Sequence, residues 1–286
     1  MATVRRPIVA GQFYEGDAGA LKIQIENCFL HKFGPGQLPK IDGNGSRKIV
    51  GLVCPHAGYV YSGPVAAKAY YELASDGRPD TVVVLGPNHT GHGSGLAIVN
   101  EGSWRTPLGN VEIDVETANR IVEETGIIDI DNTAHRFEHS IEVQLPFLQY
   151  IYGKDFKFVP ISFLMQDLQS AVEIGQVLTK VLTDRSAVVI SSSDFTHYET
   201  QKSVNKKDFA ALKAIEDLDV KQLYSIIEQQ DVSACGYGPI AALMTLAKAL
   251  GVKTAVVLSH KTSGDMIEEF SSVVGYAAVV FRKPYC

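Results

Sequence analysis

The sequence lacks the short motifs that mark several common enzyme classes. It contains no H-E-x-x-H, no C-x-x-C pair, no G-x-S-x-G and no phosphate-binding glycine loop. These absences exclude the usual signatures of metalloproteases, zinc ribbons, esterases and nucleotide-binding proteins. It also has no apolar run of membrane-spanning length, and its opening residues do not read as a signal peptide.

Basic blocks are absent as well. The chain has 26 Lys and Arg residues against 32 Asp and Glu, for a net charge of −6. We therefore expect neither a nucleic acid nor an anionic membrane surface as a partner. The four cysteines are scattered, without a close pair, which is typical of free thiols in a reducing compartment and predicts a cytoplasmic protein.

The 286 residues alternate between two kinds of segment. Apolar, β-branched runs predict strands covered on both faces, and the stretches between them have helical spacing. The pattern predicts a single α/β domain over 1–286, with a largely buried, mostly parallel or mixed central sheet flanked by helices on both faces. The predicted strands are 48–54, 80–86, 96–100, 156–163, 186–192, 254–260 and 273–281, and the predicted helices include 62–74, 114–126, 139–153, 167–184, 205–219 and 239–251.

Three of these strands end in residues that can carry chemistry. The run 48–54 leads into His56, 80–86 leads into His89, and 186–192 leads into Asp194 and His197. In open α/β sheets, ligands bind outside the carboxyl ends of the strands. If the three strands are parallel neighbours, these side chains converge on one crevice.

A lone loop histidine is usually solvated or caps a turn, and we favour that interpretation for His31, His92, His135 and His260. The shared position at strand ends favours a functional role for His56, His89 and His197 instead. Asp194, three residues before His197, either caps a turn or orients that ring and raises its basicity.

Cys235 precedes a predicted helix that starts near Pro239. A helix N-terminus favours a thiolate, although a small buried residue in a tight turn is an equal alternative. A thiolate with two imidazoles suits copper, zinc or iron and does not suit magnesium or calcium.

The stretch HRFEHSIEVQLPF (135–147) holds a further polar cluster. Glu138 and Glu142, and likewise His139 and Glu142, are spaced to share a helical face. We predict a helix over 139–153 that is kinked at Pro146. For Glu138 and Ser140 the simpler interpretation is a capped, charged helix start. For His139 a functional role stays open, as a contact to substrate or to a functional side chain.

Several of these stretches together resemble one known family. PHAGYVYSG (55–63), LGPNHTG (85–91), WRTPLG (104–109), EHSIEVQLPFL (138–148), SSSDFTHY (191–198) and CGYGPI (235–240) match the motif series of the Memo family, in order and over nearly the whole chain. That family is similar in fold to class III extradiol dioxygenases, which use non-haem iron(II). The resemblance implies that His56, His89 and Cys235 bind the metal, and that Asp194 and His197 line the same pocket, with His197 as acid–base.

The resemblance also implies one departure from those dioxygenases, because a cysteine stands where they have a carboxylate ligand. A thiolate is softer, shifts the preference towards copper(I) or zinc, and can itself be oxidised. The sequence therefore supports metal binding more strongly than ring cleavage.

Three functional hypotheses follow. The first is a metal-dependent, dioxygenase-like oxidoreductase that uses iron or copper on a small substrate, with His197 and Asp194 as catalytic residues. The alternative is a non-catalytic binding module, in which His139 and tyrosines such as Tyr59 and Tyr61 hold a peptide or a small anionic ligand. A zinc hydrolase with His197 as base is the third.

Overall fold

The protein is built around one mixed sheet. The computed structural model describes residues 3–43, 45–154 and 156–284, and within them twelve strands join in the order β1-β5-β6-β8-β3-β9-β2-β12-β10, with β11 beside β12, β4 beside β8 and β7 beside β4. The four central strands β8, β3, β9 and β2 are parallel. The strands are β1 (Val4–Arg5), β2 (Ile49–Cys54), β3 (Thr81–Pro87), β4 (Leu96–Ile98), β5 (Ser103–Thr106), β6 (Gly109–Ile113), β7 (Asp129–Ile130), β8 (Lys157–Phe163), β9 (Ala187–Ser192), β10 (His197–Glu199), β11 (Ala255–Thr262) and β12 (Val273–Arg282).

Apolar residues on both faces explain why these segments form buried central strands. Every residue of β2 and β3 is buried. Side chains of a strand alternate between faces, so Val82 and Val84 enter one hydrophobic core while Val83 and Leu85 enter the other. The sheet is therefore the middle layer of a three-layer sandwich.

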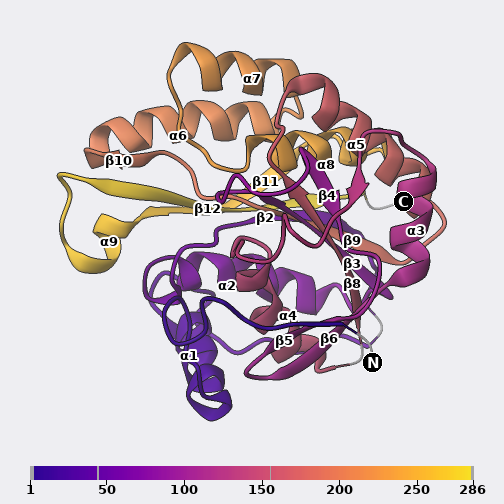
Figure 1. The fold of residues 1–286 in the computed structure, drawn as a ribbon. Helices are drawn as coiled ribbons and strands as arrows, with labels where there is room; N and C mark the ends of the chain where they lie inside the picture. Colours follow the sequence, from indigo (N-terminus) through magenta and orange to yellow (C-terminus); the bar gives the residue numbers. More distant parts are fainter. Residues whose placement is uncertain (1–2, 44, 155, 285–286) are drawn as a thin grey trace.

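Helices cover both faces, as Figure 1 shows. Leu21, Tyr70 and Phe147, from α1, α2 and α4, lie in one core. Ile121, Ile174 and Leu243, from α3, α5 and α8, lie in the other, where α6 and α7 also pack. The helices are α1 (Ala18–Leu30), α2 (Tyr59–Ser75), α3 (Val115–Glu123), α4 (Leu145–Tyr152), α5 (Leu168–Leu182), α6 (Gln201–Glu216), α7 (Val220–Gln229), α8 (Tyr237–Ala249) and α9 (Ser263–Ile267), with a 3₁₀ turn at Glu142–Gln144.

The predicted fold class is confirmed, and one local prediction needs correction. The helix expected over 139–153 with a kink at Pro146 is instead a 3₁₀ turn followed by α4, which begins at Leu145. Pro146 lies in the first turn of α4 and starts the helix rather than bending it, because the missing N–H has no intrahelical partner there. In the described residues no helix has the length and apolar character needed to cross a membrane.

The topology places the three strand ends identified in the sequence side by side. β9 lies between β3 and β2, and all three run in the same direction. Their carboxyl ends therefore meet at one edge of the sheet, as the sequence pattern anticipated. The segments that follow them carry His89, Asp194 and His56.

Gly51 in β2 provides a test of how tightly the sheet packs. A Cβ atom there would lie 2.3 Å from Cδ1 of Leu243 on α8 and 2.5 Å from the carbonyl oxygen of Val189. Gly51→Ala should therefore lower the free energy of unfolding by about 1–3 kcal/mol through overpacking. Urea unfolding measures this, with Gly126→Ala as the control, since a Cβ at Gly126 meets nothing within 4 Å. Equal stability of the two variants would contradict the packing.

Candidate metal centre and its cavity

A cavity of about 560 Å³ opens at the carboxyl edge of the sheet. His56, His89 and His139 lie together in it, and Asp194 and His197 also line it. Most of the other wall residues are aromatic or aliphatic, namely Phe13, Tyr61, Tyr198, Ile267, Val274 and Tyr276, and Ser263 and Ser272 also line it. The cavity thus combines convergent imidazoles with an apolar surround, the usual composition of a small-molecule site.

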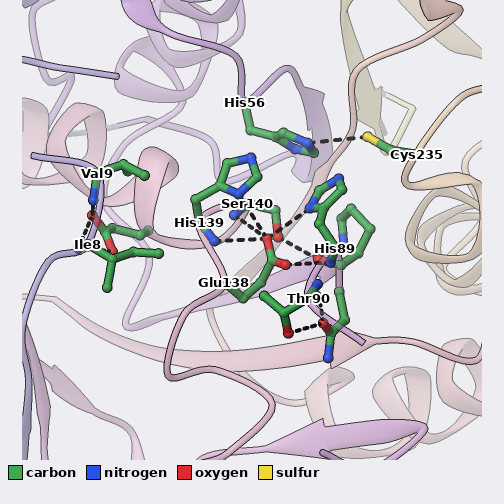
Figure 2. A network of polar contacts seen from close by, with 12 residues as sticks. Ile8, Val9, His56, His89, Thr90, Glu138, His139, Ser140 and Cys235 are labelled. Carbon is green, nitrogen blue, oxygen red and sulfur yellow. Dashed lines mark hydrogen bonds and ion pairs between the residues drawn. The ribbon is translucent and has the colours of Figure 1, made fainter. Parts of the chain in front are cut away.

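The three histidines form one compact group (Figure 2). One ring nitrogen from each lies within 4.8 Å of the others. The ring centroids are 5.2 Å apart for His56 and His89, 5.5 Å for His56 and His139, and 4.8 Å for His89 and His139. Nitrogens at this spacing can share one metal ion after small side-chain rotations.

The hydrogen bonds around His56 fix which of its nitrogens is free. Ser192 Oγ donates its proton to the Ser140 carbonyl (2.7 Å) and accepts from the Gln144 amide (2.7 Å). It can therefore only accept from His56 Nδ1–H, at 2.8 Å, which leaves Nε2 as a lone pair. Burial holds the pKa of His56 well below its ordinary value, and the neighbouring His139 and His89 add to this. The ring is thus the neutral form that a metal requires.

Glu138 organises the other two histidines. Its side chain is buried and accepts hydrogen bonds from His89 Nδ1 (3.0 Å) and from the backbone N–H groups of His139 and Ser140 (2.8 Å each). It also accepts from the backbone N–H of His89. Burial alone would raise the pKa of Glu138, but the hydrogen bond from His89 and the charges of both histidines lower it to about 2.

The same carboxylate sets the orientation of the His89 ring. Burial would lower the pKa of His89, yet the bond to Glu138 raises it overall. With Nδ1–H held by a carboxylate, Nε2 faces outward as the ligand atom. This is the arrangement that typically orients metal-binding histidines and increases their basicity.

A glycine allows the Glu138–Ser140 segment to reach the sheet edge. A Cβ at Gly86, at the end of β3, would lie 2.5 Å from Ser140 Oγ and 2.7 Å from Ile141. Ser140 Oγ donates to the Pro87 carbonyl (2.8 Å), so the loop lies directly against the strand end. This contact holds the loop in the position where His139 lies in the cavity. Phe13 packs edge-on against the His139 ring.

Cys235 lies beside the histidine group and is not part of it. Its Sγ is 3.2 Å from His56 Nε2, and the backbone N–H of Asp194 donates to the sulfur at 3.3 Å. The sequence pattern suggested a thiolate at a helix N-terminus. In the structure, burial raises the pKa of this thiol, and the Asp194 carboxylate raises it further. The protonated thiol thus donates to His56.

Asp194 and His197 share the cavity but not the predicted contact. Asp194 Oδ1 accepts the backbone N–H of His56 (2.8 Å), and burial raises the pKa of this carboxyl to about 6. The His197 ring is instead oriented by the carbonyl of Ser233, which accepts from Nδ1 at 2.9 Å, while the His197 backbone N–H donates to Ser233 Oγ. Asp194 therefore holds the His56 backbone, and the interpretation that it orients His197 is replaced.

Tyr59 is placed in the core and not in the cavity. Its hydroxyl donates to the Val143 carbonyl (2.7 Å) and its ring packs on Phe147. Tyr61 lines the cavity in its place. Two residues that are two positions apart on a helix are separated by about 200° around its axis. Only one of these two tyrosines can therefore face the site.

Neither His92 nor His260 lines the cavity. His92 is exposed, as predicted. His260 is neither solvated nor a turn cap, because its side chain is 5% exposed and its Nε2 bonds to the buried Asp208 at 2.8 Å. His135 is neither solvated nor a cap, since it is 1% exposed and packs on Trp104.

The donor set fits a transition metal. Three imidazoles present unprotonated nitrogens, a buried carboxylate fixes two of them, and a thiol lies next to the third. Imidazole and thiolate suit zinc, copper and iron, whereas magnesium and calcium prefer oxygen ligands.

Comparison with known proteins shows the family of this chain. A family model described as Memo-like protein matches residues 5–280. MEMO1 family protein MK0963 of Methanopyrus kandleri is 52% identical over 281 residues, which cover 98% of this chain and 99% of that protein. A MEMO1 family protein of Sulfolobus acidocaldarius is 50% identical over 282 residues, covering 97% and 99%.

One solved structure shows the fold alone. The uncharacterized protein JW3007 from Escherichia coli K12 is 14% identical, with a TM-score of 0.52, and the match covers 82% of this chain and all of that chain.

Glu138→Gln tests the role of the buried carboxylate. The amide keeps the shape but cannot accept from all of its present donors, so the His89 and His139 segments lose their common anchor. Affinity for zinc, used as a probe in competition with a chelator, should fall about 10–100-fold. Glu112→Gln on the exposed side of β6 is the matched control. If the zinc affinity of Glu138→Gln equals that of this control, Glu138 does not contribute to metal binding.

Proposed function

This chain belongs to the Memo-like family, and on that premise we propose that it is a metal-dependent, dioxygenase-like oxidoreductase acting on a small substrate. The observation that carries the proposal is the convergence of His56, His89 and His139 in an aromatic-walled cavity that His197 also lines. Such a pairing of metal donors with a separate titratable side chain is typical of a catalytic site rather than of a structural metal site.

The proposed metal is iron or copper, with zinc as the third candidate. His56, His89 and His139 would hold it, and Cys235 is the adjacent fourth donor because its sulfur lies next to the same His56 nitrogen. A redox-active metal bound there would supply electron transfer between substrate and dioxygen.

The chain's own residues would bind the substrate and move its proton. Ser233 holds Nδ1–H of His197, so Nε2 presents a lone pair that can take a proton from a substrate hydroxyl. Asp194 keeps His56 in place through its backbone N–H. Because the Asp194 carboxylate already accepts this backbone N–H, we assign the acid–base role to His197. Asp194 instead positions His56, one of the proposed metal ligands.

The walls indicate the kind of substrate. Phe13, Tyr61 and Tyr276 give flat apolar surfaces on which a small planar molecule can stack. The cavity volume of about 560 Å³ lies within the usual range of small-molecule sites. A small aromatic molecule with an ionisable hydroxyl fits both the walls and His197.

One observation favours the binding module as a second candidate. The rim residues Tyr198 and Ile267 are 77% and 53% exposed, so the cavity mouth is open and apolar enough to admit a peptide.

We place either function in the cytoplasm, since Cys28, Cys54 and Cys235 are free thiols and a reducing compartment preserves them.

Metal analysis of ligand variants tests the site. Protein loaded anaerobically with iron(II) or copper should lose most of its metal in His56→Ala, His89→Ala and His139→Ala. Cys235→Ser should keep iron but bind copper(I) at least about tenfold more weakly, because it lacks the soft donor. His92→Ala is the control. Metal content equal to that of this control in all four variants would reject the site.

Substrate turnover tests the reaction. Iron-loaded protein should take up dioxygen with small catechols, and His197→Gln should lower kcat about 100-fold or more with little change in KM. His92→Gln should match the wild type. Saturable binding of the same compounds without turnover by any metal-loaded form would establish the binding module instead.

A further inference from the structure

A second cavity, separate from the metal cavity, lies between the N-terminal segment and the loop 132–137. Its volume is about 570 Å³, equal to that of the first within a few per cent. The lining residues are Thr3 to Ile8, Val99, Trp104 of β5, Asn132, Thr133 and His135 to Phe137. The two cavities share no lining residue.

The charge of this cavity is of one sign. Arg5, Arg6 and Arg136 line it, and among the described residues no Asp or Glu does, although the chain as a whole carries a charge of −6. Arg5 is already occupied, since it pairs with Glu142 (2.7 Å), donates to the carbonyls of His135 and Glu138, and stacks over Trp104.

Unlike Arg5, the side chains of Arg6 and Arg136 have no charged partner among the described residues. Within residues 3–43, 45–154 and 156–284, neither guanidinium has a hydrogen bond or an ion pair, and Arg136 only stacks on Phe137. Thr3, Asn132 and Thr133 place hydroxyl and amide donors around the same space. Guanidinium groups with such neighbours are the usual means of holding an oxyanion.

The cavity wall also contains an unsatisfied acceptor. His135 is 1% exposed, and its Nε2–H donates to the Ala97 carbonyl at 3.2 Å. Nδ1 is therefore an acceptor, and it has no partner among the described residues. Burial, with a contribution from Arg5, lowers the pKa of His135 to about 4, so the ring is neutral. Because the Nδ1 atom is itself buried, the neutral His135 ring serves as cavity wall, and no ligand contact is assigned to it.

We propose that this second cavity binds a small phosphate monoester. Two free guanidiniums match the charge of a monoester, which is about −1.5 to −2 at pH 7, better than the single charge of a monocarboxylate. The organic part of the ligand lies against Val4 and Phe137. The phosphate lies between Arg6 and Arg136.

Trp104 gives this proposal a direct readout, because it is the only tryptophan in the chain and it lines the cavity. Glycerol phosphate added to the full-length protein should change the Trp104 fluorescence in a saturable manner, with matching heat in calorimetry. Arg6→Gln and Arg136→Gln should each weaken the apparent Kd about tenfold or more. Both side chains are exposed, so these variants should fold normally.

The controls separate specific binding from general charge effects. Arg120→Gln on α3 removes one arginine elsewhere and should bind as the wild type does. Acetate, a monocarboxylate, should bind at least about tenfold more weakly than glycerol phosphate at the same ionic strength. The proposal is overturned if neither fluorescence nor heat saturates at millimolar ligand, if acetate binds equally well, or if Arg6→Gln and Arg136→Gln match Arg120→Gln. Since no lining residue is shared, each outcome leaves the metal site untouched.

Discussion

A single buried carboxylate, that of Glu138, determines the geometry on which the candidate site depends. It accepts from the ring and the backbone of His89 and from the backbone of His139, so two of the three imidazoles share one anchor. A buried charge is stable only when its hydrogen-bonding capacity is used. Together with the backbone N–H of Ser140, these donors make Glu138 tolerable in the interior and thereby fix the site.

The anchor is itself held from the N-terminal side. Arg5 donates to the carbonyl of Glu138 and pairs with Glu142, whose carboxylate also accepts from Ile8, Val9 and Tyr14. Figure 2 shows Ile8 and Val9 at the edge of this network. The first residues of the chain therefore close one wall of the metal cavity, through Phe13, as well as one wall of the second cavity.

The sequence predicts those parts of the site that follow from strand periodicity. His56 and His89 come two residues after buried strands, and the parallel order of β2, β9 and β3 brings them together. His139 and Glu138 lie in a loop that no period describes, and the contact of that loop with Gly86 is purely tertiary. The orientation of His197 by Ser233 joins residues 36 positions apart. No local pattern could choose Ser233 over Asp194, which is nearer in the sequence.

The order of the strands has a consequence for how such a site comes into being. Its donors come from four separate segments, and the contact between His56 and Cys235 spans 179 positions. No fragment of the chain that ends before Cys235 contains the full set, so the donors meet only when the most distant pairings have formed. A metal ion held by all of them would bind the native state and no partly folded state. The fraction of molecules with bound metal would therefore report the fraction that is fully folded.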